Sequence, residues 1–87
     1  MFNNVIVPHY AEEHNDHTRG SVLSYEKLLD SHKELRDIGD GLYRISVYRP
    51  KDEQTEWDFE EFSDLTEAQE VFASIDSYDD LNNRHQL

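Results

Sequence analysis

The sequence of 87 residues contains no cysteine, only three glycines and only eight lysine or arginine residues. Without cysteine it forms neither a disulfide framework nor a thiolate metal site, which predicts a protein of a reducing compartment such as the cytoplasm. Three glycines leave no phosphate-cradling loop, and no apolar run approaches the roughly 18 residues of a membrane span. Neither an enzyme nor a membrane protein is expected.

The shortage of basic residues is confined to one segment. The chain has 20 acids, so its formal net charge is 8 − 20 = −12. Residues 1–51 carry eight acids and seven bases, whereas residues 52–80 carry twelve acids and no base. Nucleic acids and anionic membranes attract basic patches, so direct binding to either is not expected.

Hydrophobic periodicity predicts a single α+β domain over residues 1–87. A short strand over residues 1–8 precedes a polar loop or mobile arm over residues 9–21. A helix is predicted next, starting at Ser21 or Ser24 and stopped by the turn at residues 37–41. Its apolar stripe consists of Tyr25, Leu28, Leu29, His32 and Leu35.

Two alternating segments then predict an antiparallel hairpin over residues 42–62, with Pro50 ending its first strand. A second helix begins at Asp64, which forms a capping box with Glu67. Residues 76–87 show no period and are predicted to be an irregular acidic tail. The expected fold is a two-layer β-α-β-β-α domain, with the hairpin and the N-terminal strand in one sheet and both helices on one face.

The acids of the hairpin and of the second helix are predicted to form an exposed surface. Alternation directs Glu56, Asp58 and Glu60 away from Trp57 and Phe59, at spacings of about 6.6–6.8 Å. Tyr48 is expected on the outer face of its strand, as an aromatic anchor for a partner. The predicted partner-binding residues are Glu56, Asp58, Glu60, Asp64, Glu67, Glu70, Asp76, Asp79, Asp80 and Tyr48.

This distribution favours a non-catalytic inhibitor that mimics nucleic acid and blocks a basic DNA- or RNA-binding surface on a partner protein. In size and charge, residues 52–80 resemble small phage-encoded inhibitors that mimic DNA, such as anti-restriction and anti-CRISPR proteins. The resemblance implies the same mode of action, and it assigns no role to individual residues. The plain alternative is that the acids only keep the domain soluble.

Two other functions remain open at this stage. An adaptor or antitoxin-like module would bind a partner protein through the first predicted helix, the loop over residues 9–21 or exposed tyrosines. A metal-responsive domain would hold zinc or nickel on His9, His14 and His17, which otherwise belong to an ordinary polar loop. No cofactor is expected.

Overall fold

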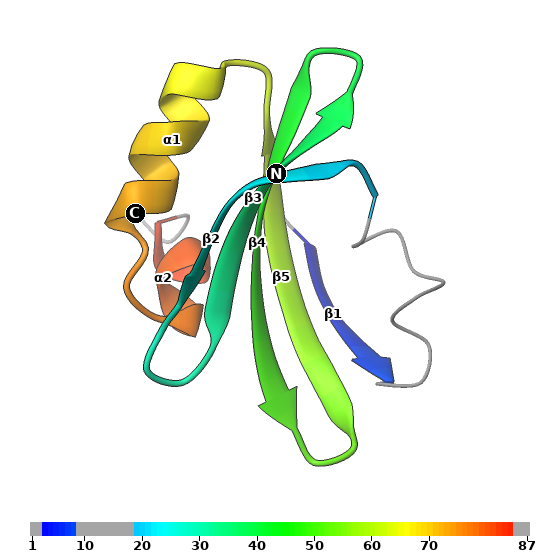
Figure 1. Ribbon diagram of the computed structural model, residues 1–87. Helices are drawn as coiled ribbons and strands as arrows, with labels where there is room; N and C mark the ends of the chain where they lie inside the picture. Colours follow the sequence, from blue (N-terminus) through cyan, green and yellow to red (C-terminus); the bar gives the residue numbers. More distant parts are fainter. Residues whose placement is uncertain (1–2, 9–18, 85–87) are drawn as a thin grey trace.

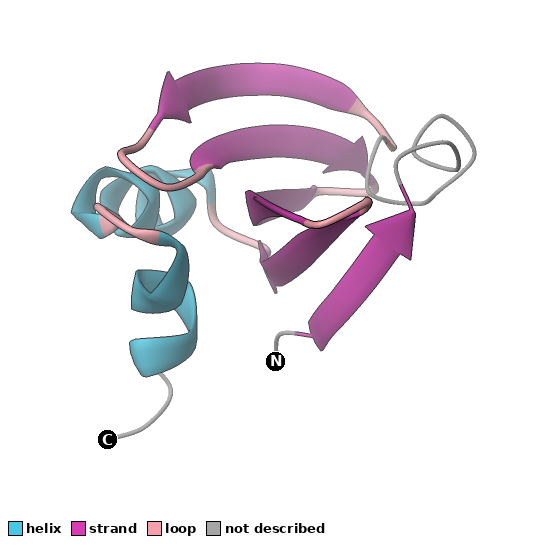
Figure 2. Cartoon of the chain, turned by 90° about the horizontal axis from the view of Figure 1, so that it is seen from below, coloured by secondary structure: helices cyan, strands magenta, loops and turns pink. Residues whose placement is uncertain are grey.

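Five strands and two helices form the protein in the computed structural model, which describes residues 3–8 and 19–84 (Figure 1). The strands are β1 (Asn3–Pro8), β2 (Ser21–Lys27), β3 (His32–Gly39), β4 (Leu42–Lys51) and β5 (Gln54–Phe62). The helices are α1 (Leu65–Ser74) and α2 (Tyr78–Asn83). All strand pairs are antiparallel, in the order β1-β5-β4-β3-β2 (Figure 1). Figure 2 shows the sheet and the helices from below. The predicted α+β class, with the hairpin and the N-terminal strand in one sheet, is confirmed.

Both helices pack on the same face of the sheet, so the domain has two layers. α1 lies against β3, β4 and β5, and α2 lies against β4 and β5. The core between the layers is built from aliphatic side chains of β3 and β4 and from one side of each helix. Its buried members are Leu35, Ile45, Val47, Phe62, Ala68, Ile75, Tyr78 and Leu81.

Local chemistry explains the two tight turns. At the β3–β4 turn, Asp40 and Gly41 have φ values of 58° and 75°, which is the left-handed region that Asp-Gly pairs favour. At the β4–β5 turn, Asp52 has a φ of 57°. β4 runs past Pro50, contrary to the prediction that this residue ends the strand. β3 begins opposite Tyr48, so Pro50 pairs only with β5, and β3 requires no N–H from it.

The predicted first helix is wrong, because residues 21–39 form the β2–β3 hairpin. The chain reverses at residues 28–31, where the Leu28 N–H donates to the Ser31 carbonyl. Of the predicted stripe, Leu35 is buried in the core, whereas Tyr25 and Leu29 are exposed. A short apolar run fits a helix or a strand equally well, and here pairing with β4 decides. Ser21, assigned to the preceding loop, is the first residue of β2.

α1 follows the sequence prediction. Asp64 caps it, with Oδ1 accepting hydrogen bonds from the N–H groups of Thr66 at 2.8 Å and Glu67 at 3.3 Å. The predicted stripe faces the core: Ala68 and Ile75 are buried, and the larger residues between them pack against the cluster.

The predicted irregular tail is also wrong, because it contains α2. Ser77 and Asp80 form a capping box at its start, a Ser-x-x-Asp signal that is visible in the sequence. Hydrogen bonds from the N–H groups of Asp76 and Ser77 hold the pKa of the Asp80 carboxyl below its ordinary value. The box turns the chain so that Tyr78 and Leu81 enter the core.

Lys33 connects the sheet to the end of α1. Its side chain is 2% exposed, and Nζ donates to the carbonyls of Phe72 at 2.6 Å and Ile75 at 2.8 Å. The ammonium group also lies 4.4 Å from the centre of the Phe72 ring and 3.7 Å from the Glu26 carboxylate. α1 has no basic residue in its last turn, so β3 supplies the positive charge that a helix C-terminus favours.

We expect Lys33→Met to lower the free energy of unfolding by about 1–3 kcal/mol, because it leaves the two carbonyls without their buried donor. Urea unfolding followed by Trp57 fluorescence measures the change. Lys27→Met is the matched control, since Lys27 is exposed, and a change within about 0.5 kcal/mol is expected there. Equal effects of the two substitutions would contradict a structural role for Lys33.

Candidate binding surfaces

The three strand acids predicted to be exposed are buried. They project from β5 toward the helices, where Glu60 lies opposite Ile45 and Asp58 lies opposite Val47. Asp58 is 0% exposed, and Glu56 and Glu60 are 9% and 8% exposed. Trp57 and Phe59 point to the other face of the sheet. Alternation grouped these side chains correctly and assigned the two groups to the wrong faces.

Two arginines neutralise two of these acids, one from the neighbouring strand β4 and one from the residue after α2. Arg49 donates to the Glu56 carboxylate at 2.6 Å, and Arg84, just after α2, donates to Glu60 at 2.8 Å. The hydrogen bond to Glu56 raises the pKa of the Arg49 guanidinium above its ordinary value. Arg49 also lies 4.3 Å from the centre of the Tyr78 ring. Glu56 and Glu60 therefore form ion pairs inside the fold. They do not present a row of exposed carboxylates to a partner.

An aromatic row crosses the opposite face of the sheet. Its rings come from β3, β4 and β5: His32 stacks on Tyr48 with centroids 4.7 Å apart, and Trp57 stacks on Phe59 at 4.5 Å. Tyr48 and Trp57, 6.3 Å apart, link the two pairs. The guanidinium of Arg44 lies over Phe59 at 4.9 Å and donates to Glu61. Trp57 is buried, as predicted, although away from the helices.

Tyr48 is not the exposed anchor that was predicted, because it is 5% exposed. Its hydroxyl donates to Glu34 at 2.9 Å, and the Arg36 Nε donates to the same carboxylate oxygen at 2.8 Å. Burial raises the pKa of the Tyr48 phenol well above its ordinary value, and the charge of Glu34 raises it further. Tyr78, expected in the tail, is a core residue, and Tyr10 lies outside the described residues.

The remaining predicted acids lie on the helical layer. One of them, Asp80, is partly buried in the capping box of α2. The other five are exposed, within α1 or α2 or next to an end of α1. We call these five the acidic helical surface: Asp64, Glu67, Glu70, Asp76 and Asp79.

Most basic side chains form ion pairs. Within the described residues, five of the eight bases of the sequence pair with carboxylates of the same chain. The paired bases are Lys33, Arg36, Arg44, Arg49 and Arg84. No lysine or arginine occurs in residues 52–83, so the acidic helical surface has no opposite charge from its own segment.

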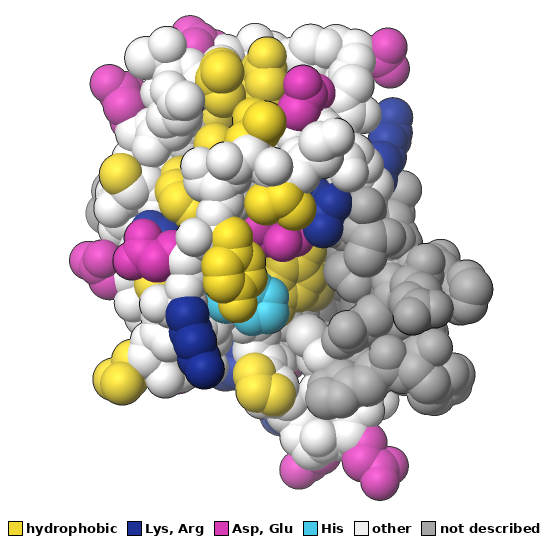
Figure 3. Space-filling model, viewed as in Figure 1, with side chains coloured by type: hydrophobic (Ala, Val, Ile, Leu, Met, Phe, Trp, Pro, Cys, Tyr) yellow, Lys and Arg dark blue, Asp and Glu magenta, His cyan; other side chains and the backbone are white. Residues whose placement is uncertain are grey.

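Sequence reasoning missed an apolar patch on the β2–β3 hairpin. All four large hydrophobic side chains that are exposed within the described residues lie there. In Figure 3, hydrophobic side chains run down the middle of the face seen, and acidic ones stand mostly at its margin. The signal that could have indicated this hairpin is the pair Asp30-Ser31, two residue types that favour turns, directly after Leu28 and Leu29. The patch consists of Val22, Leu23, Tyr25 and Leu29.

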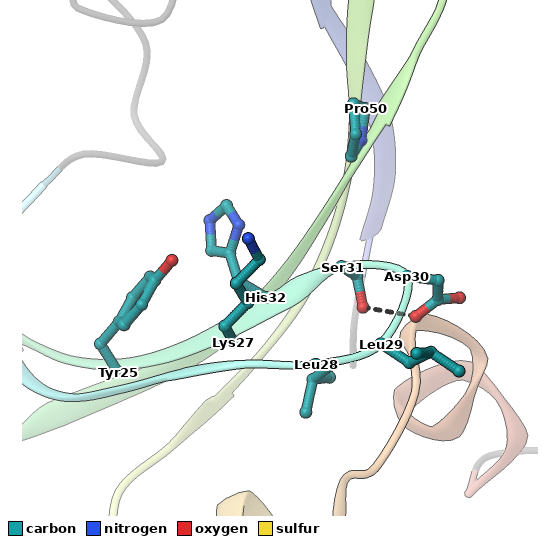
Figure 4. A pocket seen from close by; sticks show the side chains of 8 residues that line it. All are labelled: Tyr25, Lys27, Leu28, Leu29, Asp30, Ser31, His32 and Pro50. Carbon is teal, nitrogen blue, oxygen red and sulfur yellow. Dashed lines mark hydrogen bonds between the residues drawn. The ribbon is translucent and has the colours of Figure 1, made fainter.

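An open pocket of about 370 Å³ adjoins this patch at the hairpin turn (Figure 4). Tyr25, Lys27 and His32 point to the same side of the hairpin, and Pro50 of β4 completes the lining. The Ser31 hydroxyl donates to the Asp30 carboxylate at 2.9 Å at the turn. The pocket combines apolar, aromatic and charged groups, which suits contact with a protein segment.

The candidate metal ligands His9, His14 and His17 lie outside the described residues. Among residues 3–8 and 19–84, no group of three or more histidine or acidic side chains is arranged to hold a metal ion. Neither α1 nor α2 is long and apolar enough to cross a membrane.

We expect Tyr48→Phe to flatten the loss of stability above about pH 10. An unfolded tyrosine releases its proton near pH 10, whereas folded Tyr48, with its raised pKa, keeps it. Its contribution is therefore full below pH 10 and is lost as the pH rises toward the folded pKa. Urea unfolding at a series of alkaline pH values measures the slope. Tyr25→Phe, which changes an exposed tyrosine, should keep the parental slope, and an unchanged slope in Tyr48→Phe would refute the assignment.

Comparisons with known proteins assign no role to these surfaces. No protein-family model matches the chain, no curated protein matches its sequence, and no solved structure matches its fold.

Proposed function

We propose that the chain is a non-catalytic inhibitor whose acidic helical surface docks on a basic nucleic-acid-binding surface of a partner protein. One observation carries the proposal: five exposed carboxylates on the helical layer belong to a segment of 32 residues, 52–83, without lysine or arginine. On a surface that only keeps a protein soluble, acidic and basic side chains are expected to be mixed. A positive partner surface offsets the self-repulsion of such a cluster and is steered to it at low salt.

The fold supports this proposal by separating paired acids from exposed ones. Glu56 and Glu60 have arginine partners beneath the helices, so they add little to the outer field. Glu67 and Glu70 stand three residues apart on α1, which places their Cβ atoms about 5–6 Å apart on one side of the helix. A helix holds this spacing, and the order of the carboxylates lowers the entropy lost on binding.

The test uses a partner captured on the immobilised protein from a nuclease-treated cell lysate and eluted in rising salt. Heparin and a short DNA duplex are then offered as competitors at constant salt. Under the proposal, both polyanions displace the captured protein, and its affinity falls steeply as salt rises. A partner that resists both salt and polyanions would exclude mimicry.

We expect Glu67→Lys combined with Glu70→Lys to weaken binding of that partner at least about tenfold, because like charges then face each other across the interface. The control is Asp52→Lys with Glu53→Lys at the β4–β5 turn, which makes the same charge change at exposed positions away from α1. Affinities of both variants are measured by biolayer interferometry at one salt concentration. Equal weakening by the two variants would mean that only net charge matters, and the helical surface would not be the docking site.

A further inference from the structure

Among the residues that the structure describes, β2 is the strand at one edge of the sheet. Within the described residues it pairs only with β3, and all seven of its residues are exposed. Val22 is 48% exposed, Leu23 47% and Tyr25 58%, and Leu29 at the adjoining turn is 103% exposed. An edge with unpaired backbone groups and apolar side chains is a template for another strand.

The edge carries few of the features that normally block pairing. β2 contains no proline, and its register irregularity lies between Val22 and Ser24, near the start of the strand. From Ser24 to Lys27 the pairing with β3 is regular. Lys27 is the only basic residue in the strand, and it stands at the last position. The second half of β2 therefore presents a regular backbone to solvent.

Charge identifies which occupant fits this edge. The hairpin, residues 21–39, contains three bases and four acids, a net of 3 − 4 = −1, whereas residues 52–83 carry 12 acids and no base. The hairpin is thus the part of a strongly acidic molecule that a second, equally acidic molecule approaches with little local repulsion. In an antiparallel pair of two β2 strands, an apolar residue of one strand can also lie opposite an apolar residue of the other.

We propose that β2 pairs antiparallel with β2 of a second copy, forming a two-fold symmetric dimer. A two-fold axis at Ser24 sets the regular residues 24–27 of each copy against residues 21–24 of the other. Leu23, at the register irregularity, then lies opposite Tyr25 of the second copy, and this apolar pair occurs twice. The same register sets Arg19 beside the turn of the second copy, next to the acidic Asp30. The contact buries the exposed patch and unites the two sheets.

The acidic helical surfaces of the two copies stay apart in this arrangement. α1 packs mainly on β3, β4 and β5, and three strand spacings, about 14 Å, separate the β3 strands of the two copies. That distance exceeds the Debye length of about 8 Å at physiological salt and falls well within the value of about 30 Å at 0.01 M salt. Dimerisation should therefore strengthen with salt, opposite to the binding of a basic partner.

Sedimentation velocity of the full chain, over a concentration series and at salt from about 0.01 M to about 1 M, tests the proposal. We expect a monomer of 10.3 kDa at low concentration and low salt, and a species of twice that mass as either rises. A chain that stays monomeric throughout would overturn the proposal. Growth beyond the dimer would also overturn it, because a closed two-fold contact stops at two copies.

Two variants with the same charge change should differ in their effect on the monomer–dimer equilibrium. Leu23→Lys with Tyr25→Lys places two like charges on the edge, and we expect dimerisation to weaken at least about tenfold. Gln69→Lys with Ala73→Lys, at exposed positions of α1, lowers the net negative charge equally, and we expect dimerisation to be retained or strengthened. Circular dichroism confirms folding, and Leu23→Lys alone serves if the double variant unfolds. A dimer that forms equally well in the edge variants would show that β2 is not the contact.

Discussion

Burial of charge between the sheet and the helices is the constraint on which the rest of the structure depends. The Lys33 ammonium lies where α1 ends, and water cannot replace the carbonyls that it contacts. An ammonium in that position is tolerated only if those carbonyls are present, so the site requires α1 to end over β3. The position of Ile75 in turn sets where α2 begins, because only two residues separate it from Tyr78. The Lys33 side chain therefore connects the end of α1, and through it the start of α2, to β3.

The same constraint acts at the other side of the layer and divides the acids into two classes. Glu56 and Glu60 are tolerated beneath the helices because each forms an ion pair there, Glu56 with Arg49 and Glu60 with Arg84. Their pairing consumes two of the few bases in the chain. The acids on the outer side of α1 keep their charge without such partners from their own segment. Each of these pairs removes one acid and one base, so the net charge of −12 stays with the remaining side chains, and the exposed acids of residues 52–83 carry much of it.

The sequence was sufficient for features determined by neighbouring residues. Alternation predicted the hairpin over residues 42–62, and Asp64 predicted the start of α1. Features determined by distant residues were out of reach. Periodicity shows that Glu56, Asp58 and Glu60 share a face, but the arginine that selects the buried face for Glu60 is 24 residues away. The stripe from Tyr25 to Leu35 satisfied a helix as well as a hairpin, and the choice depends on pairing with β4. The wrong prediction of the exposed surface followed from these two facts: neither the face of the β5 acids nor the pairing of β2 and β3 can be read from neighbouring residues.

The two proposed contacts make different demands on the molecule and are compatible with each other. A two-fold axis that pairs antiparallel edge strands runs perpendicular to the sheet, so it keeps each face of the sheet on its own side. Both helical layers therefore lie on the same side of a joined sheet, and the dimer presents two acidic helical surfaces in one direction. A partner with an extended basic surface could then engage both, with an effective concentration for the second contact set by the fixed spacing of the two copies. Salt opposes this joint complex at the acidic surfaces while favouring the edge contact, so its stability should peak at intermediate ionic strength.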